Sequence, residues 1–316
     1  MKRLPLLLFM SVTILAVSAQ AQAPNPLENH LRGCIAKYEQ EDLEGALADC
    51  NRAIELGPTS YSPYLMRSLV LSLRGDVDRA LADLDKGIQL APGEAVLYKM
   101  RSINRFKKND LDGALADIDR AIELEPGDAA SHLGRAVLRR KKGDAEGQIA
   151  DLTKAIELQP SASTYAERGG ARFNKGDFDG AIRDLSFAIE KSPGEAGYYA
   201  LRARAKHMKS DWDGSIADHD VAIRLDPKLV NAYYNRGVTH LANRNTEAAV
   251  EDLGRAIESN PGLADSYLQR GSALLLQGKY AEAQADFDRF LKLAPDRKAF
   301  LEARIEQLKK ERGTKK

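Results

Sequence analysis

The chain has little cysteine, few aromatic residues and almost no net charge. Its 316 residues include two cysteines and one tryptophan, and aromatic residues make up only 6%. Two cysteines are too few for a scaffold held together by disulfides. A formal net charge of +1 gives no global basic excess of the kind that marks many nucleic-acid-binding proteins. The content of charged residues, 29%, also excludes a protein of many membrane spans.

One long apolar run is present, and it lies at the amino terminus. Two basic residues precede the run, which extends over 4–17, and small residues follow it at cleavage spacing. This pattern predicts a signal peptide over 1–21, cleaved after Ala21 or Ala23; an uncleaved membrane anchor is the alternative. We therefore expect an exported bacterial protein that is periplasmic or secreted, without a membrane span in the mature chain.

Prolines are few, yet eight of them keep a regular spacing. The step is 34 residues, apart from one step of 33 after Pro160. A fixed period of this size is typical of a solenoid built from repeated units. The eight residues are Pro58, Pro92, Pro126, Pro160, Pro193, Pro227, Pro261 and Pro295.

Each unit is expected to form two helices. Apolar residues recur at helical spacing, and the proline follows the last turn, where it cannot continue a helix. In three units a glycine ends the first helix, where a positive φ is favourable for glycine: Gly75, Gly143 and Gly176. In most units an Asp begins the second helix, where its carboxylate can accept hydrogen bonds from free amides: Asp42, Asp76, Asp110, Asp144, Asp177 and Asp211.

The repeated unit resembles the tetratricopeptide repeat family. Small residues such as Ala80 open the second helix, a tyrosine such as Tyr98 lies in the first helix, and Gly237 occupies the position where paired helices approach closely. Gln148 and Ser215 depart from the pattern by replacing the first small residue. The resemblance implies an all-α fold, a right-handed superhelical solenoid of about eight 34-residue helix-turn-helix repeats.

The resemblance extends over residues 27–297. A linker over 22–26 precedes the repeats in this interpretation, and an amphipathic segment over 298–313 predicts a helix that caps the solenoid, followed by a tail at 314–316. The repeats are expected at 27–60, 61–94, 95–128, 129–161, 162–195, 196–229, 230–263 and 264–297.

A basic and an acidic residue recur together. Seven repeats have an Arg at the same position of the first helix, and every second helix has an Asp at a fixed position. We predict that each Arg pairs with the Asp of its own repeat, which would fix the register of the two helices more than it adds stability. The alternative is that both side chains stay solvated. The predicted pairs are Arg67–Asp83, Arg101–Asp117, Arg135–Asp151, Arg168–Asp184, Arg202–Asp218, Arg236–Asp252 and Arg270–Asp286.

The two cysteines fall in the two helices of the first repeat. Because an exported protein meets an oxidising compartment, we expect a disulfide between Cys34 and Cys50. Two buried free thiols are the alternative.

No motif of an enzyme, metal site or cofactor site is present. The five histidines lack the His-Glu-x-x-His spacing, and neither a phosphate-binding glycine loop nor a Gly-x-Ser-x-Gly elbow occurs. His219 occupies an apolar position of a second helix, which favours a core or interface histidine over a ligand. We therefore expect no catalytic residue, no metal and no cofactor.

The resemblance places ligand binding on a concave face made by the first helices. The family's carboxylate clamp is absent, because Ile103 and not Asn follows Lys99 by four residues. The segments 95–109 and 129–142 contain ten Lys or Arg and no acidic residue, which predicts a positive stripe; an ordinary solvated face is the alternative. The expected groove residues are Lys99, Ile103, Phe106, Lys107, Val137, Arg140, Lys141, Phe173, Arg204, His207, Tyr234 and Leu241.

These features together predict a non-enzymatic scaffold in the periplasm that binds an extended, acidic segment of a protein or peptide. A binder of anionic cell-envelope polysaccharide or cell-wall polymer is the alternative, and no nucleic acid is expected as a partner. The near-zero net charge then reflects a cancellation between basic first helices and acidic second halves, which predicts a positive inner face and a negative outer face.

Overall fold

A computed structural model describes residues 25–313, and this part of the chain contains helices and no strand. The signal peptide predicted over 1–21, most of the predicted linker and the tail at 314–316 lie outside the described residues. In the first half of the chain the helices are α1 (Pro26–Glu39), α2 (Leu43–Leu56), α3 (Tyr61–Arg74), α4 (Val77–Leu90), α5 (Ala95–Lys107), α6 (Leu111–Leu124), α7 (Ala129–Lys142) and α8 (Ala145–Leu158). In the second half they are α9 (Ala162–Lys175), α10 (Phe178–Lys191), α11 (Ala196–Met208), α12 (Trp212–Leu225), α13 (Val230–Ala242), α14 (Thr246–Ser259), α15 (Ala264–Gln277) and α16 (Tyr280–Leu293), followed by the 3-10 turn η2 (Pro295–Arg297) and α17 (Lys298–Gly313).

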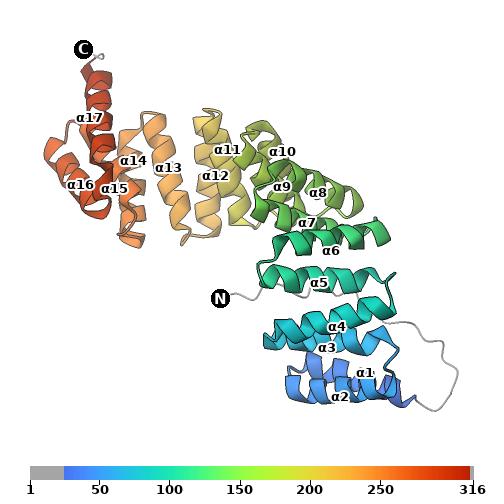
Figure 1. The fold of residues 1–316 in the computed structure, drawn as a ribbon. Coiled ribbons are helices and arrows are strands. Elements are labelled where there is room, and N and C mark those ends of the chain that lie inside the picture. The colour runs from blue at the N-terminus through green and yellow to red at the C-terminus, as the bar shows by residue number, and fades with distance from the viewer. Residues whose placement is uncertain (1–24, 314–316) are drawn as a thin grey trace. The chain divides into compact units, whose positions relative to one another are not determined.

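Consecutive helices pack in pairs, α1 with α2 and so on to α15 with α16 (Figure 1). The chain divides into two compact units, with the boundary between Pro160 and Ser161. The first unit contains α1–α8 and the second contains α9–α17. The all-α repeat solenoid predicted from the sequence is confirmed. None of the helices within 25–313 is both long enough and apolar enough to cross a membrane.

The first helices of neighbouring pairs lie against one another within each unit. Contacts join α1 to α3 and α3 to α5 in the first unit, and α9 to α11, α11 to α13 and α13 to α15 in the second. The second helices of neighbouring pairs stay farther apart in the described chain. The first helices therefore form the inner face of each unit, which we call the first-helix face.

The turns inside the pairs have the geometry that the sequence predicts. Asp110 Oδ1 accepts a hydrogen bond from the Gly113 amide at 2.9 Å, and the other five predicted aspartate caps make the equivalent bond. Gly75 ends α3 in the left-handed conformation, with φ of 90°. In repeats without a glycine at this position, Asn109 and Ser210 adopt it with φ of 63° and 60°. The turn geometry is thus kept even where the favoured residue is missing.

Each predicted Arg–Asp pair is present. Arg135 Nη2 donates to Asp151 Oδ1 at 2.7 Å, and the other six pairs have the same arrangement. Several of these arginines also reach back to the second helix of the preceding repeat, as Arg135 Nη1 does to Asp119 at 2.7 Å. One guanidinium therefore joins the two helices of its own pair and connects that pair to its predecessor. The sequence analysis predicted the first role and not the second.

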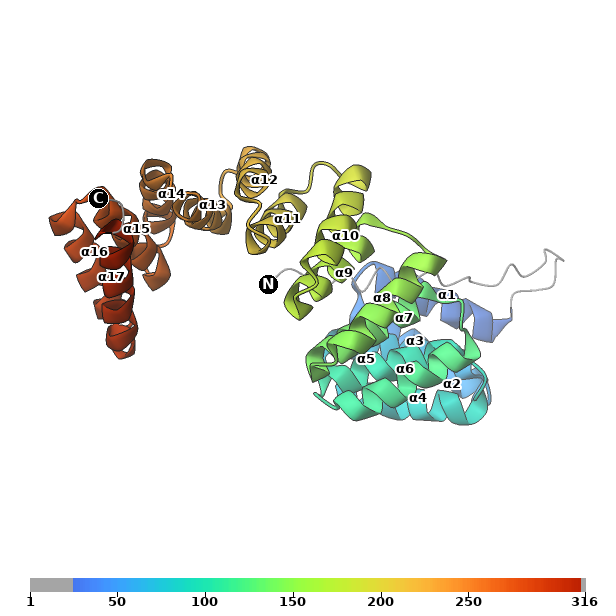
Figure 2. The same ribbon diagram turned by 90° about the horizontal axis from the view of Figure 1, so that it is seen from above.

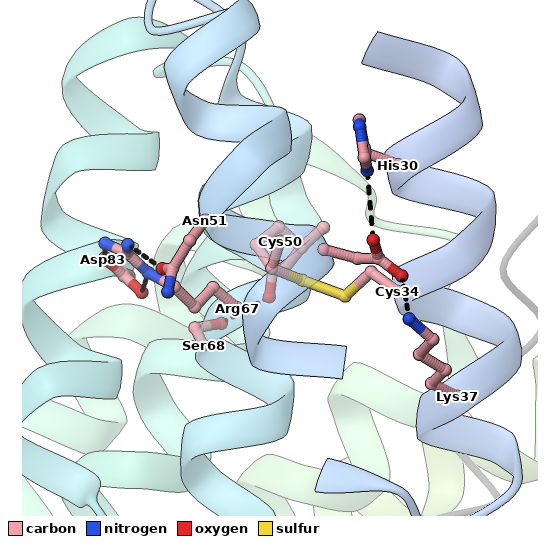
Figure 3. Close-up of a disulfide and its surroundings, with 10 residues drawn as sticks. His30, Cys34, Lys37, Cys50, Asn51, Arg67, Ser68 and Asp83 are labelled. Carbon is pink, nitrogen blue, oxygen red and sulfur yellow. Dashed lines mark hydrogen bonds and ion pairs between the residues drawn. A yellow bond between two sulfur atoms is a disulfide. The ribbon is translucent and has the colours of Figure 1, made fainter. Parts of the chain in front are cut away.

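The predicted disulfide is also present. It joins Cys34 of α1 to Cys50 of α2, and both residues have no exposed surface (Figure 3). Val70 and Leu71 of α3 belong to the same buried cluster. In the first pair Gly33 occupies the position of the paired Arg, and Lys37 Nζ lies 2.7 Å and His30 Nδ1 lies 3.0 Å from the Asp49 carboxylate. The hydrogen bond from Lys37 and that from His30 lower the pKa of Asp49.

The last helix, α17, packs on α15 at the end of the second unit (Figure 2). Leu301 and Leu308 are buried in a cluster with Phe287 and Phe290. Phe300 does not belong to this buried cluster, because it is 52% exposed. Its ring lies 5.0 Å from the guanidinium carbon of Arg297 and points out of the core.

Gly237 lies where α13 and α14 approach most closely. A Cβ atom at this position would lie 2.8 Å from Leu253 Cγ and 3.2 Å from Asp252 Cβ. We expect Gly237→Val to destabilise the second unit by about 1–3 kcal/mol through overpacking, measured by urea unfolding. Gly254→Val is the matched control within the same pair, since the nearest atom to its Cβ would be Arg270 Nη1 at 3.7 Å. Equal losses from the two variants would contradict the close-approach argument.

Candidate functional site

Seven of the predicted groove residues belong to α5 and α7 in the first unit. Ile103, Phe106 and Val137 are half-buried, whereas Lys107, Arg140 and Lys141 are exposed. The Lys99 ammonium is mostly covered, because its Nζ lies 3.1 Å from both Glu125 and Asp128.

Most basic residues of α5 and α7 are neutralised by carboxylates. The residues with carboxylate partners are Lys99, Arg101, Arg105, Lys108, Arg135, Arg139 and Lys142. Lys107 Nζ donates instead to Ser72 Oγ at 2.6 Å, and the partial burial of this ammonium group, on an otherwise exposed side chain, lowers its pKa. Within residues 25–313, Arg140 and Lys141 have no recorded carboxylate partner. The positive stripe predicted from the ten basic residues is thus reduced to a small exposed cationic patch, which we define as Arg140 and Lys141.

A cavity opens on the first-helix face of the second unit. Its volume is about 130 Å³, and side chains from α9, α11, α12 and α13 line it. Three of the predicted groove residues come together here, namely Phe173, Arg204 and His207. The complete lining consists of Phe173, Arg204, His207, Met208, His219, Asn235, Val238 and Thr239.

The other two predicted residues of the second unit lie outside the cavity lining. Tyr234 is half-buried, and burial raises the pKa of its hydroxyl. Leu241 is only 7% exposed and packs with Ala249 and Leu253 in the core between the helices. Leu241 therefore belongs to the core and not to the groove surface, which corrects the sequence-based prediction.

An aromatic ring and a cation form one side of the cavity. The guanidinium carbon of Arg204 lies 4.7 Å from the centre of the Phe173 ring. Arg204 is exposed and has no recorded carboxylate partner in the described chain, so its charge remains available on the first-helix face. On the other side, the His207 ring packs edge-on against Trp212, with 4.9 Å between ring centres.

His219 of α12 is one of the buried lining residues. It has no exposed surface, and neither ring nitrogen has a hydrogen-bond partner. Burial, and secondarily the nearby Arg236 charge, lower the pKa of His219 to about 3, so its imidazole is neutral near pH 7. A buried polar group without a partner is uncommon in folded proteins, and it marks this position as unusual.

Two polar residues of α12 replace the side chains that other repeats use for packing. The position of His219 is filled elsewhere by Cys50, Leu84, Ile118, Leu152, Leu185, Leu253 and Phe287. The position of Ser215 is filled by alanine in every other repeat except the one with Gln148. Both departures are visible in the sequence, and His219 is buried as predicted, but the cavity was not predicted. The two polar residues, Ser215 and His219, lie four residues apart on one helix, and this spacing could have predicted the cavity.

Thr239 of α13 contacts side chains of α11 and α12, the helices that contain His207 and His219. Its Oγ1 lies 2.8 Å from the Asn235 carbonyl oxygen, 2.9 Å from His207 Nδ1 and 3.3 Å from Ser215 Oγ. Thr239 and Asn235 were missed from the sequence, since each belongs to an ordinary amphipathic helix. In residues 25–313 no three His, Cys, Asp or Glu side chains are grouped as a metal ion would need.

Paired helices that repeat every 34 residues are typical of one class of repeat protein, and the comparison with known families agrees with that class. The family model described as tetratricopeptide repeat matches residues 100–163, 167–230 and 234–298, which is more than half of the chain. The chain therefore belongs to the tetratricopeptide repeat family. Such repeats are scaffolds suited to binding proteins or peptides. The search of curated proteins found no match.

Solved structures of tetratricopeptide repeat proteins resemble this fold. YrrB, described as a TPR protein with an unusual peptide-binding site, has a TM-score of 0.51 and 22% identity, covering 56% of this chain and 92% of its own. A tetratricopeptide repeat protein from Parabacteroides merdae has a TM-score of 0.54 and 17% identity, covering 79% of this chain and 99% of its own. Identities this low show a common fold and no more.

Proposed function

We propose that this protein is a non-enzymatic scaffold of the bacterial periplasm that holds an extended segment of another protein on its first-helix faces. The observation that carries the proposal is the exposed Arg204 stacked on Phe173 at a cavity of the first-helix face. An extended chain presents apolar and polar groups in alternation, and an aromatic ring beside a cation can bind both.

An acidic ligand is part of the proposal. The supporting residues are Arg140 and Lys141, which are exposed cations without carboxylate partners in the described chain. A long anionic polymer would need a higher density of free cations than this, because each neutralised phosphate or carboxylate contributes a small, salt-sensitive term. We therefore favour a protein segment over the polysaccharide alternative.

The location in the periplasm follows from two features. The predicted signal peptide directs export, and a buried disulfide is compatible with an oxidising compartment. We propose that cleavage after Ala21 or Ala23 releases a mature chain with eight repeats over 27–297 and a capping helix over 298–313.

A capture experiment with charge-reversed protein tests the proposal. Arg140→Glu/Lys141→Glu is expected to weaken binding of captured periplasmic partners about tenfold, because two attractive contacts become repulsive. Lys86→Glu/Arg120→Glu is the matched control: both residues are basic and belong to the second helices α4 and α6 of the same unit. Partner affinities would be measured by titration at two salt concentrations. Identical partner profiles from both double variants would refute binding at the first-helix face, and capture of an anionic polysaccharide alone would favour the alternative.

A further inference from the structure

We propose that the cavity of the second unit binds one uncharged carboxamide group, the side chain of a Gln or Asn in the segment that the scaffold holds. The proposed function supplies the source of this ligand, and the inference adds which chemical group enters the cavity. It rests on the cavity itself, on the unpartnered buried imidazole of His219, and on the polar residues that surround it.

The cavity floor is polar where the repeat pattern calls for an apolar residue. Leu185 and Leu253 fill the equivalent space in the neighbouring repeats, and both are fully buried. His219 instead leaves two nitrogen atoms unsatisfied beside an open volume. A buried polar group without a partner costs stability, so an apolar residue would pack better at this position. A ligand bound in the cavity would supply the hydrogen-bond partner that the His219 nitrogens lack.

The hydrogen bonds around Thr239 determine which atoms remain for a ligand. The Thr239 hydroxyl donates to the Asn235 carbonyl oxygen at 2.8 Å, so its oxygen acts as acceptor for His207 Nδ1 at 2.9 Å. With its proton on Nδ1, a neutral His207 has a lone pair on Nε2. Neutral His219 adds one N–H donor and one further lone pair. The Asn235 amide and the Arg204 guanidinium also line the cavity, which therefore combines donors with acceptors.

A primary carboxamide matches this set of atoms better than a carboxylate does. Its NH₂ group can donate to an imidazole lone pair while its oxygen accepts from His219 N–H or Arg204. A carboxylate could accept from Arg204 and from His219 N–H, but it has no donor for the two imidazole lone pairs, which would stay unpaired. Both imidazoles resist protonation, since burial lowers the pKa of His207 as well as that of His219. The methylene groups of Gln or Asn would lie against Phe173 and Val238.

Two isosteric probes test the assignment at pH 7.5, where both histidines are neutral. They are N-acetyl-glutamine-N-methylamide and its glutamate counterpart, titrated into the full-length mature protein and followed by NMR of the histidine rings and of Thr239. We expect saturable shifts at the cavity with the glutamine probe and at least tenfold weaker binding of the glutamate probe. Equal binding, preference for glutamate, or no binding of either would overturn the proposal.

His219→Leu is the decisive variant, because leucine is the residue of the neighbouring repeats and removes the unsatisfied nitrogens. We expect it to abolish the glutamine response while raising the unfolding midpoint by about 2–4 °C. His132→Tyr is the matched control: it restores the residue found at the equivalent position of the adjacent repeats, Tyr98 and Tyr165, and lies in the other unit. It should leave the glutamine response intact. A response that survives His219→Leu would refute the role of the cavity.

Further arms separate this inference from the proposed function. Free propanamide carries the same group without a peptide; we expect it to shift the same histidine and Thr239 resonances, and the absence of any shift would overturn the assignment to a carboxamide. Partner capture that depends on Arg140 and Lys141 but does not respond to His219→Leu would refute the cavity site and leave the scaffold function standing. Glutamine binding without any captured partner would support the cavity site and refute the scaffold function.

Discussion

Replacing Asp151 by alanine is expected to destabilise the first unit by about 3–5 kcal/mol, because it removes the buried carboxylate that two largely covered guanidinium groups share. Asp151 is 1% exposed. Its carboxylate accepts from Arg135 Nη2 at 2.7 Å and from Arg139 Nη1 at 2.8 Å. Both guanidinium groups are largely covered, so water cannot replace the lost carboxylate well. Urea unfolding together with hydrogen exchange of α7 and α8 would measure the loss.

Asp119→Ala provides the comparison, since it removes the other carboxylate of Arg135. The Asp119 side chain is 49% exposed, and Arg135 would keep Asp151. Exposed ion pairs contribute about 0–1 kcal/mol, so this variant should unfold nearly as the wild type does. A combined Arg135→Met/Arg139→Met/Asp151→Leu variant should recover most of the stability, as apolar replacement of whole buried ion pairs often does. Similar losses for Asp119→Ala and Asp151→Ala would show that burial does not set the strength of these pairs.

The Arg–Asp pairs could be predicted because each repeat contains both partners at one fixed separation. Arg135 and Asp151 are joined by a short helical hairpin, so knowledge of the pair of helices suffices to bring them together. The second partner, Asp119, belongs to the preceding repeat. Its distance depends on how one pair stacks on the next, which no pattern within a repeat specifies.

The positive stripe was overestimated for a related reason. Counting charges along α5 and α7 gives ten cations, but a count for one helix does not include the carboxylates that neighbouring helices bring to it. Lys99 shows the difference, since Glu125 and Asp128 beyond the next helix cover its ammonium. Only Arg140 and Lys141 emerge from these two helices as exposed cations without a recorded partner in the described chain.

The cavity could be predicted least of all. An empty volume arises from the sizes and rotamers of side chains on four helices, so no single residue predicts it. His219 was expected to be buried, and it is. Neither of its nitrogens has a hydrogen-bond partner, while Thr239 in the same cavity lining bonds to Asn235 and His207. Competition among several polar groups for a few partners is decided in three dimensions.

Removing the disulfide is expected to cost the first pair of helices about 3 kcal/mol. The cross-link joins residues that are 16 positions apart, and closing a loop of this length lowers the entropy of the unfolded chain by about that amount. Stability in a repeat protein is approximately a sum of repeat and interface terms, so the loss should be local. Hydrogen exchange over 26–56 in the presence and absence of a reductant would measure it.

Two variants separate the cross-link from the packing of the cysteines. Cys34→Ala/Cys50→Ala removes both the bond and some buried volume, whereas Cys34→Ser/Cys50→Leu reproduces the Ser68 and Leu84 of the next repeat. If the bond stabilises by constraining the unfolded chain, the Ser/Leu variant should still exchange faster than the wild type over α1 and α2. It should also lose all sensitivity to reductant. Wild-type protection in the Ser/Leu variant would assign the effect to packing alone.

The end position explains why the cross-link is placed in this pair. In the described chain α1 and α2 pack against α3 on one side, whereas the pair α3 and α4 has α2 on one side and α5 on the other. The ion pair of Lys37 with Asp49 cannot substitute for a second neighbour, because an exposed lysine gains little from such a contact. At the opposite end, α17 buries Leu301 and Leu308 against the last pair. The two ends are thus secured by different means, and reductant should increase exchange at α1 and α2 while leaving α15 and α16 unchanged.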